Sequence, residues 1–190
     1  MLSYISLRNF KNFSDIKVDF TGSYGEPKKL IVIYGENGAG KTNLMQALNF
    51  LSQSIETLLN QQRLEKLNIE KQESLNELLD EDIAQQFVEA LMKAQFITLE
   101  GLIKRYKMLD SEDPMILEYG FRINNHDGAY YVKFNNREVI EEKLSYFIQS
   151  RKGQYYHITS KEIYLSPSIF REQYGREIQQ EIKKYWGKHT

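Results

Sequence analysis

The residues best suited to chemistry in this sequence lie in one short glycine-containing segment. It matches the pattern G-x-x-x-x-G-K-[ST] without a mismatch and includes the residue after it: Gly35, Glu36, Asn37, Gly38, Ala39, Gly40, Lys41, Thr42 and Asn43. Because glycine has no Cβ atom, such a loop can bring several backbone N–H groups close to a polyphosphate. Lys41 can reach the terminal phosphates, and the Thr42 hydroxyl is placed to bind Mg²⁺. The segment therefore predicts a nucleotide-binding site, with Lys41 as the catalytic residue and Thr42 as the metal ligand.

The flanking sequence predicts the elements that position this loop. Residues 30–34 are apolar and mostly β-branched, which is typical of a strand buried on both faces. After Thr42, apolar residues recur at helical spacing, which predicts a helix to about residue 60. Such a helix would direct its free N–H groups and the positive end of its dipole at the same anion.

Composition and charge exclude several classes of protein. The 190 residues are 41% hydrophobic and 27% charged, which indicates a soluble globular protein. The absence of cysteine excludes disulfides and thiolate zinc sites and favours a cytoplasmic location. No apolar run approaches the ~20 residues of a membrane span, so we expect no membrane partner. Residues 151–190 carry a net charge of +4, which can mark a nucleic-acid contact but is more often a solvated surface.

The segments around the loop resemble one branch of the ATPases. Residues 5–13 read Ile-Ser-Leu-Arg-Asn-Phe-Lys-Asn-Phe and precede the glycine loop by about thirty residues. Together with the loop residues Glu36-Asn37 and Asn43-Leu44, this pattern is similar to the start of ABC-type, AAA-family P-loop ATPases of the RecF, SMC and OLD-like branch. The resemblance covers roughly the first 50 residues. It implies ATP and Mg²⁺ as cofactors, and it implies that the turn at Asn9, Phe10 and Lys11 lies near the adenine or ribose. Ordinary core packing is the alternative explanation for Phe10.

We therefore expect an α/β P-loop NTPase fold, in the form of an ABC-ATPase-like N-terminal lobe. Residues 1–60 would hold the nucleotide-binding strands, the loop and the first helix. Residues 61–112 predict a helical insertion, acting as a lid on the core or as a docking element. Residues 113–165 predict an antiparallel β-subdomain with a turn over 124–128, and residues 166–190 predict a helix that starts near residue 168.

The resemblance also shows which parts this sequence lacks. An ABC-type ATPase needs a Walker B strand ending in Asp-Glu, a Leu-Ser-Gly-Gly signature segment and a switch histidine. Asp80 and Glu81 follow only two apolar residues within a helical pattern, so they do not fit Walker B. We expect an incomplete ATPase domain whose C-terminal lobe supplies the missing groups. The full protein is expected to form a head-to-head homodimer, and this chain alone to be inactive or very weakly active.

Three functions are compatible with these patterns. The favoured one is ATP hydrolysis as part of a larger machine for DNA repair or anti-phage defence, with DNA or an effector nuclease as the partner. The second is a small self-contained phosphotransferase or GTPase. That function needs an Asp after an apolar strand or an Asn-Lys-x-Asp segment, and neither is present. The third is a nucleotide-gated interaction module without catalysis.

Overall fold

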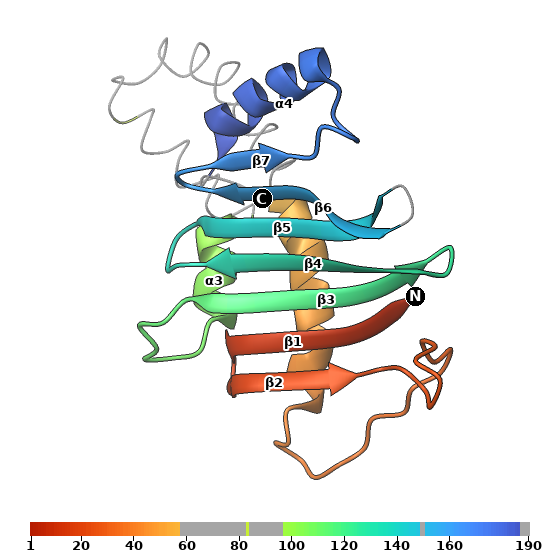
Figure 1. The fold of residues 1–190 in the computed structure, drawn as a ribbon. Coiled ribbons are helices and arrows are strands. Elements are labelled where there is room, and N and C mark those ends of the chain that lie inside the picture. The colour runs from red at the N-terminus through yellow and green to blue at the C-terminus, as the bar shows by residue number, and fades with distance from the viewer. Residues whose placement is uncertain (58–82, 84–96, 149–150, 187–190) are drawn as a thin grey trace.

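A seven-stranded antiparallel sheet forms the body of the protein (Figure 1). The computed structural model describes residues 1–57, 83, 97–148 and 151–186. The order of the strands in the sheet is β2-β1-β3-β4-β5-β6-β7. The strands are β1 (Leu2–Phe10), β2 (Phe13–Asp19), β3 (Met115–Ile123), β4 (His126–Phe134), β5 (Val139–Ile148), β6 (Arg151–Thr159) and β7 (Ile163–Leu165). The antiparallel sheet predicted from residues 113–165 is therefore confirmed, and the two N-terminal strands extend it.

Strand β1 contains an irregularity that explains a slip in its hydrophobic pattern. Ile5 and Leu7 alternate normally and lie in the core. Asn9 then adopts a left-handed backbone conformation with φ of 53°, which asparagine tolerates better than most residues. As a result Phe10, the next residue, is also fully buried.

The connection from β3 to β4 is tighter than the sequence predicted. Asn124 and Asn125 both have positive φ values, of 48° and 62°, as a two-residue hairpin turn requires. Ile123 pairs directly with His126. The predicted turn over 124–128 is therefore wrong in length, because residues 126–128 belong to β4. Strand β7 was not predicted either, since three residues are too few to show a period.

Helices cover one face of the sheet. The helix that begins at residue 41 is described to residue 57, and in Figure 1 it runs behind the strands with α3 (Leu99–Tyr106) beside it. Helix α4 (Glu172–Tyr185) follows β7, and it begins later than predicted, with Arg171 as its N-cap. Apart from α3, most of the predicted insertion lies outside the described residues. Within those residues, no helix is both long enough and apolar enough to cross a membrane.

Four aromatic rings join the helices to the sheet. Phe50 of the helix over 41–57 makes edge-on contacts with Phe10, Tyr106 and Phe134 at centroid distances of 5.3–6.1 Å. Phe10 stacks on Tyr106 at 5.6 Å. Such pairs contribute about 0.5–1.5 kcal/mol each beyond their buried area. The cluster therefore fixes the helix, and with it the start of the helix at Lys41, against β1, β4 and α3.

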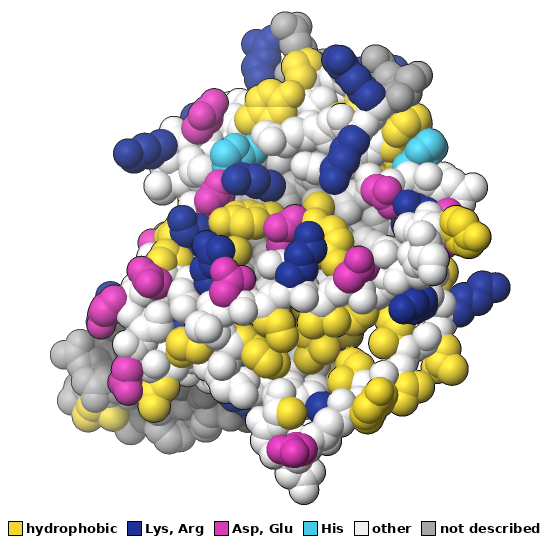
Figure 2. Space-filling model, turned by 60° about the horizontal axis from the view of Figure 1, so that its bottom comes forward, with side chains coloured by type: hydrophobic (Ala, Val, Ile, Leu, Met, Phe, Trp, Pro, Cys, Tyr) yellow, Lys and Arg dark blue, Asp and Glu magenta, His cyan; other side chains and the backbone are white. Residues whose placement is uncertain are grey.

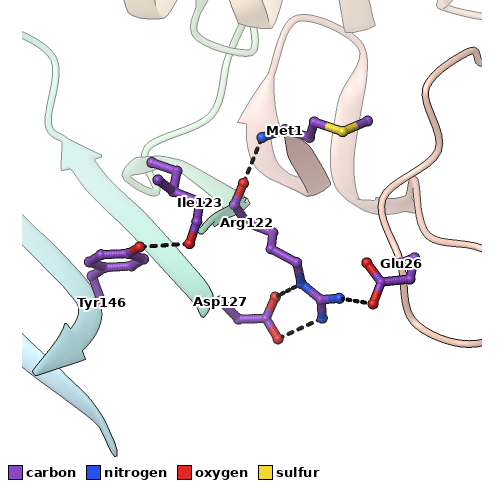
Figure 3. A network of polar contacts seen from close by, with 6 residues as sticks. All are labelled: Met1, Glu26, Arg122, Ile123, Asp127 and Tyr146. Atoms are coloured by element: carbon purple, nitrogen blue, oxygen red, sulfur yellow. Dashed lines mark hydrogen bonds and ion pairs between the residues drawn. The ribbon is translucent and has the colours of Figure 1, made fainter. Parts of the chain in front are cut away.

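A polar network holds the opposite end of β1 (Figure 3). The N-terminal ammonium of Met1 donates to the carbonyl oxygen of Arg122 at 2.7 Å. The guanidinium of Arg122 bonds both carboxylate oxygens of Asp127 and forms an ion pair with Glu26 at 2.8 Å. Tyr146 donates to the carbonyl of Ile123 beside it. Because Glu26 belongs to the loop that leads to residues 30–34, the network anchors the chain just before the glycine-containing segment.

Candidate phosphate-binding site

The helix over 41–57 starts with backbone groups that suit an anion. The N–H of Leu44 donates to the carbonyl of Gly40 at 3.0 Å, so Gly40 is the N-cap. The N–H groups of Lys41, Thr42 and Asn43 therefore have no partner within the helix. Three such donors at the positive end of the helix dipole are chemically suited to a phosphate.

The side chain of Lys41 folds back over its own loop. Its Nζ atom donates to the carbonyl oxygens of Gly35 at 2.7 Å and Glu36 at 2.6 Å. The lysine thus bonds back to the start of the predicted segment, and residues 37–40 turn between the bonded residues. Thr42 is exposed at the first turn of the helix. The structure therefore gathers the predicted residues 35–43 into one compact loop, while their roles toward ATP stay predictions.

Gly40 is held by both its backbone conformation and its surroundings. Its φ of +89° lies in a region that residues with a side chain adopt only with strain. A Cβ atom on Gly40 would lie 2.6 Å from Cζ of Phe13, which is far inside van der Waals contact. The tip of the Phe13 ring, at the start of β2, therefore lies directly against the residue that caps the helix.

The turn between β1 and β2 also reaches the first helical turn through a hydrogen bond. Asn43 Nδ2 donates to Asn12 Oδ1 at 2.6 Å. Sequence reasoning missed the contacts of Asn12 and Phe13, because it used these residues only as part of the motif over 5–13. A signal for these contacts was present in the sequence, because Asn12 and Phe13 are the last two residues of the motif that carried the family resemblance.

The residues predicted near the adenine or ribose have other partners. Asn9 donates to the carbonyl of Pro114 at 3.0 Å, and Phe10 is fully buried in the aromatic cluster. The ammonium of Lys11 lies 5.0 Å from the centroid of the Tyr106 ring, and its side chain is half-buried. The turn lies beside the candidate loop, and it contacts the loop through the two residues after Lys11. A base or ribose contact remains a prediction for this turn.

The segment before the loop departs from the prediction. Residues 30–34 are not part of the sheet and do not form a buried strand. Exposure alternates along them, with Leu30, Val32 and Tyr34 exposed at 80%, 73% and 91%, and Ile31 and Ile33 at 41% each. Figure 2 brings the bottom of the Figure 1 view forward and shows hydrophobic side chains gathered there. The segment is an extended chain with one side turned inward and one turned to solvent.

The inward side of this segment faces the predicted site. A hollow of about 420 Å³ is lined by Ile31, Ile33, Lys41, Thr42 and Met45. A strand buried on both faces needs neighbouring strands on its two edges. The described residues offer none, and this is the physical reason for the difference from the prediction.

Comparison with known proteins places this sequence in a family. The sequence matches the AAA ATPase domain family over residues 1–190. A DNA replication and repair protein RecF from Tropheryma whipplei is 44% identical over 52 residues, which are 27% of this chain and 13% of that protein. An ATP/GTP phosphatase from Helicobacter pylori is 44% identical over 52 residues, 27% of this chain and 12% of its own length. A RecF protein from Lactococcus lactis is 39% identical over 51 residues, again 27% of this chain and 12% of its length.

The matched stretch thus spans only about an eighth of each of these relatives. The similarity to RecF predicted from the opening motif is confirmed. Since the family match runs over the whole sequence, the chain belongs to the AAA ATPase domain family.

Proposed function

We propose that this chain is the ATP-binding lobe of a RecF-like, ABC-type ATPase. The observation that carries the proposal is the start of the helix over 41–57. There, three backbone N–H donors and the ammonium of Lys41 lie within one loop. Membership of the AAA ATPase domain family supports ATP as the ligand of that loop. The loop is residues 35–43, as the sequence predicted.

The residues present fit a magnesium-bound triphosphate. The N–H groups of Lys41, Thr42 and Asn43 would donate to phosphate oxygens, and the exposed Thr42 hydroxyl would hold Mg²⁺. The ammonium of Lys41 would exchange its two loop carbonyls for phosphate oxygens, because a charged acceptor binds it more strongly. Bound Mg²⁺ neutralises phosphate charge as it develops during transfer. The chain's own part is to bind and orient the triphosphate.

Hydrolysis, in this proposal, needs groups from a second lobe that is not part of this sequence. The exposed segment at residues 30–34 supports this, because its apolar outer side and unpaired edges would be covered by strands of such a lobe. The Walker B carboxylates and the signature segment would come from that lobe, and two assembled heads would form a homodimer around ATP.

The biological setting follows from the relatives and is equally a proposal. RecF proteins are named for DNA replication and repair, which favours DNA as the partner of the assembled protein. A role in anti-phage defence with an effector nuclease is the other setting that the family resemblance implies. Because one relative is named an ATP/GTP phosphatase, the preference for adenine or guanine nucleotides has to be measured separately.

Nucleotide titration of the 190-residue chain tests the proposal. Thermal unfolding is followed with Mg-ATP, Mg-GTP and Mg²⁺ alone, and phosphate release is measured in parallel. We expect Mg-ATP to raise the unfolding temperature, because a ligand of the folded state stabilises it by mass action. Phosphate release should stay near background. An unchanged unfolding temperature at millimolar Mg-ATP would contradict the proposed ATP site. Rapid phosphate release would contradict the proposal that hydrolysis needs a second lobe.

A further inference from the structure

A narrow seam joins the turn between β1 and β2 to the flank of the helix over 41–57. At the phosphate-binding end of the seam, Asn43 donates to Asn12 and the Phe13 ring covers Gly40. At the far end, Phe50 packs edge-on against Phe10. The seam therefore connects the helix cap directly to the sheet.

Few polar contacts hold this seam. In the part of the chain that the structure describes, the bond between Asn12 and Asn43 is the one side-chain hydrogen bond from the turn to this helix. Gln46 lies three residues after Asn43 and four before Phe50, so helical spacing puts it on the same flank. Its buried Oε1 atom has no hydrogen-bond partner among the described residues. From the turn, the first helical turn is thus held by the Asn12–Asn43 hydrogen bond and by the contact of Phe13 with Gly40.

We propose that Asn12 and Phe13 are positioning residues for the phosphate-binding loop. The hydrogen bond fixes the rotation of the first helical turn, and the ring stops Gly40 from relaxing toward β2. Both effects keep the N–H groups of Lys41, Thr42 and Asn43 converging on one point. Neither side chain needs to contact the nucleotide. The inference rests on the proposed function, because it concerns how the same loop is held ready for phosphate.

A double-mutant cycle tests the hydrogen bond. Asn12→Ala, Asn43→Ala and the double variant of the 190-residue chain are titrated with Mg-ATP, and unfolding temperatures are measured without ligand. We expect each single variant to weaken Mg-ATP binding about fivefold, as for the loss of one hydrogen bond. The double variant should lose little more than a single one, because the two side chains act through the same contact. Additive losses would show that the two asparagines act separately and would overturn this part.

Variants at Phe13 test the aromatic contact. Phe13→Ala should weaken Mg-ATP binding about tenfold, whereas Phe13→Leu, which keeps most of the volume, should weaken it less. The matched control is Phe147→Ala, because Phe147 is also half-buried but stacks on His126 in another part of the sheet. That control should lower the unfolding temperature without changing Mg-ATP affinity.

The outcomes separate this inference from the function on which it rests. If the wild-type chain does not bind Mg-ATP, the proposed function fails. If the wild-type chain binds and the Asn12 and Phe13 variants bind equally well, the function stands and the positioning role is overturned. A loss of stability in Phe13→Ala with unchanged affinity would likewise reduce Phe13 to a packing residue.

Discussion

Lys41 and Gly35, both in the proposed phosphate-binding loop, are joined by a 2.7 Å hydrogen bond from Nζ to the carbonyl oxygen. The same ammonium bonds the carbonyl of Glu36. The loop is therefore shaped around the lysine before any phosphate arrives, so the charge lies where the triphosphate would enter. Removal of the lysine should affect both the loop and its ligand.

Lys41→Ala is expected to weaken Mg-ATP binding by a factor of ten or more, because charge-assisted hydrogen bonds contribute about 1.5–3 kcal/mol. Titration of the purified variant with Mg-ATP measures this. The matched control is Lys161→Ala, at an exposed lysine in the connection between β6 and β7, which should keep wild-type affinity. Equal affinity of the two variants would show that phosphate does not bind at this loop.

Two valines of opposite burial test the position of the segment over 30–34. Val32 is exposed, whereas Val132 is buried under the helices at 2% exposure. Val32→Ala should change the free energy of unfolding by less than about 0.5 kcal/mol. Val132→Ala should lower it by about 2 kcal/mol, since it removes buried methyl groups and leaves a cavity. Chemical denaturation of both variants gives the two values, and a large loss at Val32 would mean that the segment is packed within this chain.

The polar network at Arg122 should stabilise the loop before residue 30. Arg122→Ala removes the ion pairs to Asp127 and Glu26, and we expect only a small fall in the unfolding temperature, because both carboxylates are largely exposed. Hydrogen exchange should rise in residues 20–29. Arg137→Ala, at an exposed arginine between β4 and β5, is the control and should leave exchange unchanged.

The Arg122 network also predicts an acid dependence. The hydrogen bond from Arg122 holds the pKa of Asp127 below its usual range. A carboxylate with a lowered pKa in the folded state contributes stability above its unfolded pKa, and this stability is lost as the pH falls through the folded value. The difference in stability between wild type and Arg122→Ala should therefore shrink as the pH falls below about 4. A difference that is constant between pH 7 and pH 3 would contradict this.

Glu142 predicts a pH effect of the opposite sign. It shares a face of the sheet with Val132 and Ile158 and accepts a hydrogen bond from Tyr156 at 2.7 Å. Burial raises the pKa of Glu142. The folded state therefore prefers the protonated acid, and stability falls as the pH rises from the unfolded pKa through the raised folded value. Glu142→Gln, which is always neutral, should gain in unfolding temperature relative to wild type between pH 4 and pH 7, with Glu162→Gln as the exposed control.

The sequence predicted the sheet well where strands carry a local pattern. From Met115 to Phe134 the side chains alternate, and the two asparagines of the turn supply the positive φ values that a tight hairpin needs. The prediction of a buried strand at residues 30–34 was wrong, because burial on both faces depends on neighbouring strands rather than on the segment itself. Local pattern cannot show whether those neighbours are present.

The candidate site was predicted in part for a similar reason. The loop residues from Gly35 to Asn43 form a contiguous motif, so their proximity follows from the sequence alone. The contact of Phe13 with Gly40 joins two distant segments, and a phenylalanine that braces a loop looks the same in sequence as one that fills a core. Only the folded arrangement of β2 against the helix cap distinguishes the two.

The exposed outward side of residues 30–34 has a consequence for the solubility of the protein in the cell. Leu30, Val32 and Tyr34 of this uncharged segment are exposed, and its backbone pairs with no strand of the described residues. Exposed segments of this composition pair with copies of themselves and seed aggregates. Unless another polypeptide shields this segment soon after synthesis, the protein should become insoluble as its concentration rises.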